Sequence, residues 1–315
     1  MSKYLITANV KVVGETEEGS LWNVVKLCCS MTKPRIVISI SLSALIGFVL
    51  HPNFLSFPFW MSSVLVLSVA LTTAGGAVLN HYLERESDKF MERTKNRPLP
   101  SGKLRDPQQS FWFGISLAGI GIFLSYQFLG TASAVYLFLG AFSYVVIYTA
   151  WLKHRSIWNV PVGGICGTFA VFVGSSVGGG ALTLESCLFG MMLHFWSPAH
   201  FWNFAVYQRN DYRKAGIPQL PEVVGIVPTN CWIAAHTIAV IFCSAGLAFW
   251  GSPGWLFGGI ALISGFLFLF FNLLNIVDPS DALSRKNFIF SLIYLTALFL
   301  GIVVDFYFQF FLGLN

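Results

Sequence analysis

The sequence predicts an all-α protein that crosses a membrane many times, and three observations support this fold class. Of the 315 residues, 55% are hydrophobic and 10% are charged, and the mean hydropathy is +0.68. These values are typical of a polytopic membrane protein and not of a soluble one. Nine segments are apolar over the ~20 residues that a spanning helix needs. All 19 Lys and Arg residues lie near the start of the chain or in the loops after every second segment.

The segregation of positive charge fixes the expected topology. By the positive-inside rule, the N-terminus and the loops after even-numbered spans are cytoplasmic, and the C-terminus is outside. We therefore expect a cytoplasmic N-terminal segment over residues 1–34 and one nine-helix membrane domain over residues 35–315. The predicted spans are 35–51, 57–82, 109–129, 132–151, 157–176, 182–207, 229–250, 254–275 and 287–312.

The N-terminal segment carries no targeting signal of a familiar kind. It lacks an apolar stretch followed by a small-residue cleavage site, and it is not the Arg-rich, acid-poor type of transit peptide. Residues 21–29 are amphipathic and are expected on the cytoplasmic membrane surface. The net charge of +5 reflects the topology and predicts no binding to nucleic acid. The six cysteines form no metal-ligand or CxxC spacing, which favours a packing role.

The first two spans and the fifth carry packing signals. Lys33-Pro34-Arg35 is a helix start with proline near the first turn. Gly75 and Gly76 in the second span would let another helix approach closely, and residues 163–167 of the fifth span are similar.

Charged side chains are concentrated where the second span leaves the membrane, in NHYLERESDKFMERTKNRPLPSG from Asn80 to Gly102. Asn80, Glu84 and Asp88 are four residues apart, so they form one stripe on a helix that continues past the membrane edge. Oxygen ligands of this kind suit Mg²⁺, which takes one or two carboxylates and fills its other positions with water and phosphate oxygens. Arg93, with Lys95 and Arg97 behind it, would neutralise phosphate. The alternative is a solvated loop with helix-supporting charge pairs.

A second charged stretch follows the sixth span and lies on the same membrane face. Asp211 is flanked by Arg209 and Lys214, and glycines and prolines up to Gly225 predict a structured loop or lid. The turn after the fourth span contributes Lys153, which serves either as a topogenic anchor or as a phosphate ligand.

Polar aromatic residues precede Asp211 within the sixth span. His194, Trp196, His200 and Trp202 lie deeper in the membrane, where polar groups tend to face a cavity or a partner. They either line a pocket or pack against neighbouring helices.

Two acid-and-base clusters above an apolar bundle predict a substrate with a diphosphate head and a hydrocarbon tail. Mg²⁺ and cationic side chains would stabilise the departing diphosphate. An apolar cavity would protect the allylic carbocation from water.

The motifs also resemble a known family. NxxxExxxD followed by MERTKNRPLPSG is similar to the first aspartate-rich motif of the UbiA-type intramembrane prenyltransferases, whose fold is a nine-helix bundle. Further segments resemble the protoheme IX farnesyltransferase (heme O synthase) branch of that family. These are TKPRI at 32–36, YTAWLKHRSIWNVPVGG at 148–164, WSPAHFW at 196–202 and DYRKAGIPQLP at 211–221.

This resemblance implies a reaction. Farnesyl would pass from farnesyl diphosphate to the 2-vinyl group of heme B, with addition of water, giving heme O and diphosphate. The resemblance also implies Mg²⁺ as cofactor, an active site on the cytoplasmic face of a bacterial inner membrane, and heme A synthase or an oxidase assembly as partner.

The resemblance assigns roles to residues of this chain. Glu84, Asp88 and Asp211 would hold metal, and Asn80 and His200 complete the catalytic set, with His200 in heme contact or proton handling. The diphosphate-binding set would be Arg93, Lys95, Arg97, Lys153, Arg209 and Lys214.

Three positions depart from the family pattern. Ala215 stands four residues after Asp211, where quinone-type relatives have a second aspartate; Ala199 stands where the heme branch has proline; and the fifth span lacks an expected proline. Prenyl transfer to a quinone precursor or a chlorophyll-type acceptor is therefore the alternative function. A transporter is a more distant one, because its ionisable residues would lie along a path near the bilayer midplane.

Overall fold

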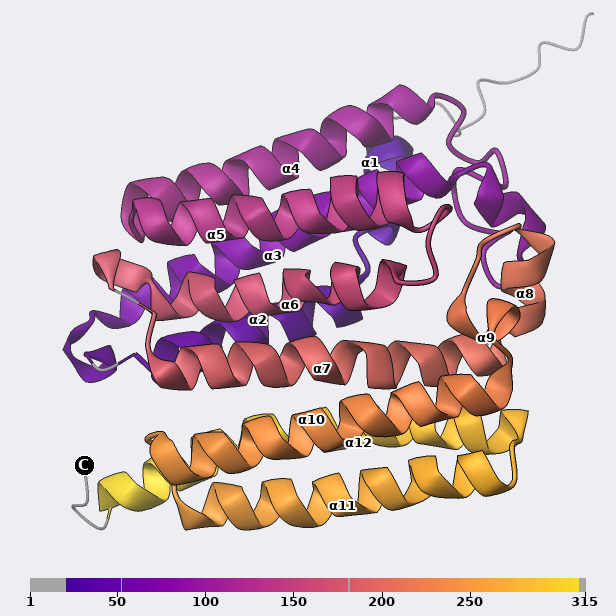
Figure 1. The fold of residues 1–315 in the computed structure, drawn as a ribbon. Coiled ribbons are helices and arrows are strands. Elements are labelled where there is room, and N and C mark those ends of the chain that lie inside the picture. Colours follow the sequence, from indigo (N-terminus) through magenta and orange to yellow (C-terminus); the bar gives the residue numbers. More distant parts are fainter. Residues whose placement is uncertain (1–20, 52, 181, 312–315) are drawn as a thin grey trace, which may run out of the picture.

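The computed structural model describes residues 21–51, 53–180 and 182–311, and all regular elements within them are helices. The expectations for residues 1–20 lie outside this range. The fold is an up-and-down bundle in which long helices run antiparallel to their neighbours in the chain (Figure 1). The first half of the chain forms one side of the bundle, and the second half forms the other.

Helices occupy all nine ranges predicted as spans. In chain order they are α2 (Pro34–Val49), α3 (Phe59–Glu84), α4 (Pro107–Phe128), α5 (Thr131–Phe142) continued by the π-helix η4 (Ser143–Leu152), α6 (Asn159–Ser175), α7 (Leu184–Tyr207), α10 (Ile226–Trp250), α11 (Trp255–Val277) and α12 (Asp281–Phe311). The observed ends differ from the predicted ones by a few residues. The largest shift is at α12, which begins six residues before the predicted start at 287.

Fewer helices meet the length and hydropathy that a membrane span needs than occupy the nine predicted ranges. Among the described residues, six helices are long and apolar enough to span a membrane, and a bent pair, α1 (Leu21–Ser30) with α2, would make a seventh. The chain is thus an integral membrane protein. Helix α6 is apolar but has 17 residues, and α7 carries polar groups along its length. Nine spans therefore remain a prediction.

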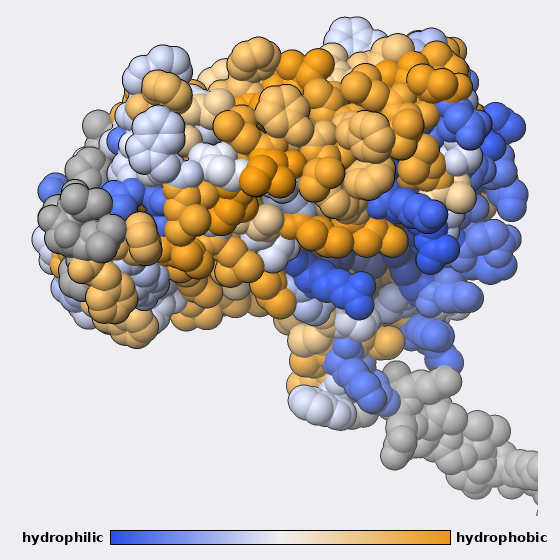
Figure 2. Space-filling model, turned by 90° about the horizontal axis from the view of Figure 1, so that it is seen from below, coloured by the Kyte–Doolittle hydropathy of each residue, from blue (hydrophilic) through white to orange (hydrophobic). Residues whose placement is uncertain are grey.

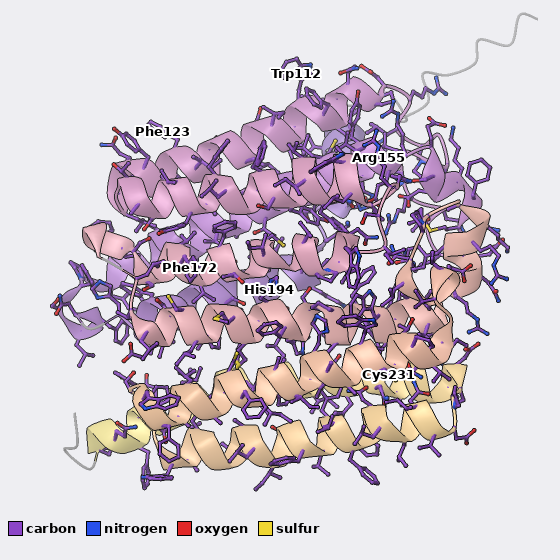
Figure 3. All side chains as sticks on the ribbon, viewed as in Figure 1. Trp112, Phe123, Arg155, Phe172, His194 and Cys231 are labelled. Carbon is purple, nitrogen blue, oxygen red and sulfur yellow. The ribbon has the colours of Figure 1, made fainter. Side chains whose placement is uncertain are left out.

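Short elements complete the ends of the bundle. At one end lie η3 (Ser87–Phe90), α8 (Arg209–Lys214) and α9 (Leu220–Val223), and at the other lie η2 (Phe54–Ser56) and η5 (Val177–Gly179). The end with η3, α8 and α9 also carries the described Lys and Arg residues, and we call it the charged end. Figure 2 shows hydrophilic residues gathered at this end and hydrophobic ones over the middle of the visible face. In Figure 3, Trp112 and Phe123 project outward from α4, whereas Arg155 lies toward the charged end.

Glycines allow two helix pairs to approach closely. A Cβ atom on Gly174 of α6 would lie 1.9 Å from the carbonyl oxygen of Ala44 in α2. A Cβ atom on Gly75 of α3 would lie 2.5 Å from the carbonyl oxygen of Gly114 in α4. The close-packing role predicted for Gly75 is confirmed, because any larger residue there would push α4 away.

Buried polar groups join the helices of the second half. Asn272 of α11 is the centre of this network: its Oδ1 accepts from Asn203 Nδ2 and from Asn287 Nδ2, each at 3.1 Å, and its Nδ2 donates to Thr237 Oγ1 at 3.1 Å. At the end opposite the charged one, the Asp305 carboxylate of α12 accepts from backbone N–H groups at the start of α11. These contacts hold α7, α10, α11 and α12 in one register.

Candidate active site

A chain of polar contacts crosses the charged end between three helices. Lys33, in the turn before α2, donates from Nζ to Asn80 Oδ1 at 2.5 Å. Asn80 Nδ2 donates to Glu84 Oε1 at 2.7 Å, and Lys153 Nζ donates to the same oxygen. Glu84 is 3% exposed and Lys153 is 6% exposed. A buried ion pair such as this one depends on its partners, because an unpaired charge would be costly to bury.

Asp88 lies next along the chain and is fully buried. Its Oδ2 accepts from Arg97 NH1 at 2.7 Å, and Thr94 Oγ1 donates to its backbone carbonyl at 2.9 Å. Its Oδ1 has no hydrogen-bond partner. Buried polar atoms are nearly always paired, so this oxygen is a free acceptor inside the site. We call Lys33, Asn80, Glu84, Asp88, Arg97 and Lys153 together the acid–base cluster.

The expectation of one continuous helix from Asn80 to Asp88 is wrong. Helix α3 ends at Glu84, and Asp88 lies in the 3₁₀ turn η3. Side chains end the helix by binding carbonyls of its last turn: Arg85 NH1 donates to Tyr82 O at 2.7 Å, and Ser87 Oγ donates to Glu84 O at 3.1 Å. Asp88 is thereby directed to Arg97 and does not extend a helical stripe.

The second predicted cluster lies beside the first. Asp211, on α8, accepts at Oδ2 from the backbone N–H of Arg93 at 3.2 Å. Lys214 Nζ lies 4.0 Å from Glu92 Oε1, and the side chain of Arg209 pairs with Asp281. The loop after α3 and helix α8 are therefore in contact, as their position on one membrane face predicted.

The remaining predicted cations point in different directions. The Arg93 guanidinium lies over the ring of Phe204, 5.3 Å from its centroid, and Lys95 forms an exposed pair with Glu92. Lys153 and Arg97 lie in the acid–base cluster. The structure thus brings two of the six predicted diphosphate ligands to the buried carboxylates, and the other four have different partners at the charged end.

Sequence reasoning missed three polar residues of the site. Lys33 was considered only as a helix start, yet its Nζ also lies 3.3 Å from the hydroxyl of Tyr144. Thr149 Oγ1 accepts from Asn80 Nδ2 at 3.1 Å. Tyr144 and Thr149 belong to the π-helix η4, a form often found at functional sites. The available signals were the motifs TKPRI, which contains Lys33, and YTAWLKHRSIWNVPVGG, which contains Thr149, whereas Tyr144 is a polar side chain within an apolar span.

Burial lowers the pKa of the Lys33 ammonium to about 7. Glu84 and Asp88 act in the opposite direction, whereas Arg97 and Lys153 lower the pKa further. These effects show that all five charges lie close together.

The donor set can be tested for its fit to a metal ion. Among the described residues, no three His, Cys, Asp or Glu side chains are grouped closely enough to hold a metal by themselves. Mg²⁺ needs fewer protein ligands, because it usually keeps waters and binds substrate phosphates through one or two carboxylates. The unpaired Oδ1 of Asp88 and the neighbouring carboxylate of Glu84 fit that requirement. In the structure Lys153 and Arg97 neutralise these carboxylates.

An aromatic column descends from the rim between α7 and α12. Below Arg93 lies Phe204, whose ring centroid is 5.0 Å from that of Phe288. Phe288 stacks on His200 at 4.5 Å, and Trp196 stacks on the other face of His200 at 4.5 Å. Both faces of the imidazole are covered, so His200 can meet a ligand only with its edge.

Hydrogen bonds define which edge of His200 is available. Its Nδ1 lies 2.6 Å from Ser291 Oγ, and that hydroxyl donates to the carbonyl of Phe288 at 2.6 Å. Because the hydroxyl proton is used, the oxygen accepts and Nδ1 carries the ring proton. Nε2 is then the unprotonated nitrogen, which is the form that binds a metal or takes up a proton. His194 precedes His200 in α7 and lies nearer the middle of that helix (Figure 3). Its ring packs against that of Phe195.

Comparison with known proteins identifies a family. Residues 40–301 match the model of the UbiA prenyltransferase family. The chain is 32% identical over 289 residues to a protoheme IX farnesyltransferase of Bartonella tribocorum, covering 90% of this chain and 92% of the relative. It is 36% identical over 282 residues to protoheme IX farnesyltransferase 2 of Paramagnetospirillum magneticum, covering 89% and 96%.

Solved structures share the fold at lower identity. A digeranylgeranylglyceryl phosphate synthase superposes with a TM-score of 0.74 at 18% identity, covering 90% of this chain and 98% of that one. A UbiA homologue from Archaeoglobus fulgidus bound to GPP and Mg²⁺ superposes with a TM-score of 0.63 at 13% identity, covering 88% and 99%. At these identities the likeness shows the fold alone.

Proposed function

The chain belongs to the UbiA prenyltransferase family, and we propose that it is a protoheme IX farnesyltransferase. It would transfer farnesyl from farnesyl diphosphate to the 2-vinyl group of heme B, giving heme O and diphosphate. The choice of acceptor rests on the curated relatives that bear this name at 32 to 36% identity over about nine-tenths of the chain. One structural observation supports prenyl transfer: buried carboxylates and cations lie together at one end of an apolar bundle.

The acid–base cluster would hold the diphosphate head. The carboxylates of Glu84 and Asp88 would hold Mg²⁺, which when bound would supply positive charge to neutralise the leaving diphosphate. The binding of Mg²⁺ and GPP by the Archaeoglobus fulgidus homologue supports this choice of metal. Lys153 and Arg97, which pair with the two carboxylates, would then turn to phosphate oxygens. Asn80 and Thr149 would keep Glu84 oriented during the exchange.

The residues at the rim would complete the head-group site. Arg93, Lys95, Arg209 and Lys214 lie at the same charged end as the cluster and would attract the anionic head over a longer range. Asp211 would act mainly by holding the loop of Arg93 through its hydrogen bond to the backbone N–H. Asp211 and Lys214 would also form a second metal or phosphate site beside the cluster.

The chemical step would proceed by loss of diphosphate. The C1–O bond of farnesyl diphosphate breaks, and its electron pair leaves with the diphosphate. The terminal vinyl carbon of heme then attacks C1, which places a positive charge on the carbon next to the porphyrin. Water adds to that carbon and loses one proton, so that farnesyl diphosphate, heme B and water give heme O and diphosphate. The apolar bundle keeps other water away from the allylic cation.

His200 would contact the acceptor. Its ring cannot stack on the porphyrin because Trp196 and Phe288 cover both faces. Its unprotonated Nε2 suits coordination of the heme iron or uptake of the proton that water releases, and Ser291 would hold the ring in that form. The column between α7 and α12 would thus form the acceptor side of the site.

The proposal places the protein in a bacterial cytoplasmic membrane with the charged end in the cytoplasm, where the positive-inside rule locates it. A heme A synthase or an oxidase assembly would receive the product.

Incubation of the purified protein in nanodiscs with Mg²⁺, farnesyl diphosphate and heme B tests the reaction. Liquid chromatography with mass spectrometry should detect a heme that has gained a farnesyl group and one water. Unmodified heme together with prenylation of a quinone precursor or a chlorophyll-type acceptor would support the alternative function. No diphosphate release with any acceptor would refute prenyl transfer.

The role of His200 has a separate test. His200→Ala should weaken heme binding and slow turnover, while affinity for farnesyl diphosphate stays the same. His236→Ala is a matched control, because His236 also lies within a long helix, where it hydrogen-bonds the Trp232 carbonyl at 2.9 Å. An unchanged heme titration in His200→Ala would remove His200 from the site.

A further inference from the structure

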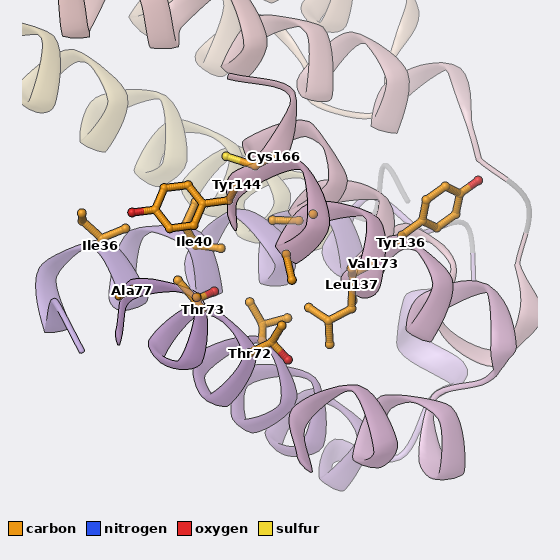
Figure 4. A pocket seen from close by; sticks show the side chains of 15 residues that line it. Ile36, Ile40, Thr72, Thr73, Ala77, Tyr136, Leu137, Tyr144, Cys166 and Val173 are labelled. Carbon is orange, nitrogen blue, oxygen red and sulfur yellow. The ribbon is translucent and has the colours of Figure 1, made fainter. Parts of the chain in front are cut away.

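A narrow pocket lies between α2, α3, α5 with η4, and α6, and its lining is almost wholly apolar. Figure 4 shows Tyr144, Ile36 and Ala77 at one end of the pocket and Leu137 and Val173 toward the other. The Tyr144 ring lines the pocket, and its hydroxyl lies 3.3 Å from Lys33 Nζ. The pocket therefore begins directly below the acid–base cluster.

Small side chains form the walls of this pocket. Thr73, Gly76 and Ala77 of α3 and Gly140 and Ala141 of α5 all line it. A Cβ atom on Gly76 would already lie 3.4 Å from Tyr144 Cδ1, so the pocket has little room to spare there. A pocket with so little free space suits a single hydrocarbon chain and not a flat ring system.

Larger residues close the far end of the pocket, where Tyr136 lies beyond Leu137 and Val173 (Figure 4) and packs against the hydrophobic cluster there. Val69, Leu137 and Val173 line it and are at most 5% exposed. The same three residues belong to the hydrophobic cluster that fills the bundle beyond the pocket, together with Phe48 and Leu65. The pocket thus ends against close-packed core, which yields little to an added methylene group.

The depth of the pocket can be compared with prenyl chains. Asn80 and Val69 are eleven residues apart on α3, which at the helical rise corresponds to ~16 Å along the axis. An extended chain gains ~1.25 Å per carbon from bonds of ~1.5 Å, so the chain carbons of geranyl, farnesyl and geranylgeranyl groups extend ~9, ~14 and ~19 Å. Farnesyl fits between the cluster and the closed end, and geranylgeranyl does not.

We infer that this pocket holds the prenyl tail and that Val69, Leu137 and Val173 set the longest chain the protein accepts. The inference rests on the proposed function, since it concerns the tail of the same substrate. It assigns selectivity for 15 carbons to the closed end of the pocket and not to the diphosphate site.

A substitution that deepens the pocket and one that narrows it should shift the preferred prenyl chain length in opposite directions. Leu137→Ala deepens the pocket, and the affinity ratio of the 20-carbon to the 15-carbon chain should rise by about tenfold or more. Ala141→Leu narrows the slot, and the 15-carbon chain should lose affinity by a similar factor relative to the 10-carbon chain. The probes are the S-thiolodiphosphate analogues of the three prenyl diphosphates, bound in the presence of Mg²⁺ and measured by calorimetry in nanodiscs.

Leu129→Ala is the matched control. Leu129 belongs to the same hydrophobic cluster as Leu137 and is 1% exposed, but it does not line the pocket. This variant should lose stability without any change in the order of chain lengths. If Leu137→Ala does not fold, Ala141→Leu decides, because it adds atoms to a lined slot and removes none from the core.

The outcomes separate the inference from the proposed function. Equal affinity of the wild-type protein for all three chains, as for a tail that leaves the bundle into lipid, would overturn the inference. An unchanged preference in both pocket variants would also overturn it. If the wild-type protein binds none of the analogues, the proposed function itself fails.

Discussion

Removing the cation of the buried pair between Lys153 and Glu84 should destabilise the protein strongly. In Lys153→Met the Glu84 carboxylate, 3% exposed, keeps its hydrogen bond from Asn80 but loses its ion partner. Breaking a buried pair on one side typically costs 3–5 kcal/mol, because a charge is left buried and uncompensated. Since Lys33 also acts on Glu84, we expect a loss at the lower end, about 3 kcal/mol.

The double variant separates the cost of the lone charge from the loss of packing. In Lys153→Met combined with Glu84→Gln, the buried carboxylate charge that has lost Lys153 is removed as well, and most of the lost stability should return. Binding of prenyl diphosphate should stay weak in both variants, because the phosphate ligand is missing from each. Stability and binding would thus respond differently to the same second substitution.

The measurement is reversible unfolding of the purified protein with increasing dodecyl sulfate, followed by tryptophan fluorescence. Lys95→Met is the control, since Lys95 and its partner Glu92 are 46% and 61% exposed. An exposed pair contributes at most ~1 kcal/mol, so this variant should unfold like the wild type. A Lys153→Met protein as stable as the Lys95→Met protein would refute the argument that the Lys153–Glu84 pair is buried and mutually dependent.

Three further predictions follow from the structure. Asp88→Asn keeps the hydrogen bond from Arg97 but removes the charge, so turnover should fall ~10²-fold or more with the fold intact; wild-type turnover would exclude Asp88 as a metal ligand. Because the folded-state pKa of Lys33 is lowered to about 7, the ammonium is lost above that pH. Affinity for a prenyl thiolodiphosphate should therefore fall by up to ~tenfold between pH 6 and 8, and more steeply than in Lys33→Arg, which stays charged; parallel pH profiles would contradict this. Asp305→Ala leaves backbone N–H groups of α11 unpaired and should cost ~2 kcal/mol in the unfolding assay without affecting binding at the opposite end; an unchanged unfolding midpoint would show that the cap is dispensable.

The positions of the helices could be predicted from the sequence because hydropathy and positive charge act over whole segments. A span of ~20 apolar residues is a strong signal that tolerates exceptions. The ends of the helices and the directions of their polar side chains were harder to predict, because local contacts determine them. The spacing of Asn80, Glu84 and Asp88 indicated one helical face, but Arg85 and Ser87 bind the carbonyls that would continue the helix. Such caps depend on rotamers and not on periodicity.

Contacts between residues that are far apart in the chain could not be predicted from the sequence either. Lys33 and Tyr144 are 111 positions apart in the chain, and their hydrogen bond follows from the packing of η4 beside the start of α2. No spacing rule connects them, because Lys33 belongs to the TKPRI motif before one apolar span and Tyr144 is a polar residue within another. The sequence also does not show that Asp305 caps the start of α11, because the backbone N–H groups that it binds belong to another helix.

The two halves of the bundle divide the proposed reaction between them. The tail pocket belongs to α2, α3, α5 and α6, whereas the aromatic column with His200 belongs to α7 and α12. The halves meet at the charged end, where the Arg93 N–H binds Asp211 and the Arg93 guanidinium lies over Phe204. Arg93 therefore belongs to the loop that would hold the diphosphate, and its guanidinium contacts the wall that would hold the acceptor. A change in the position of that loop would therefore shift Arg93 relative to the Phe204 wall of the acceptor side.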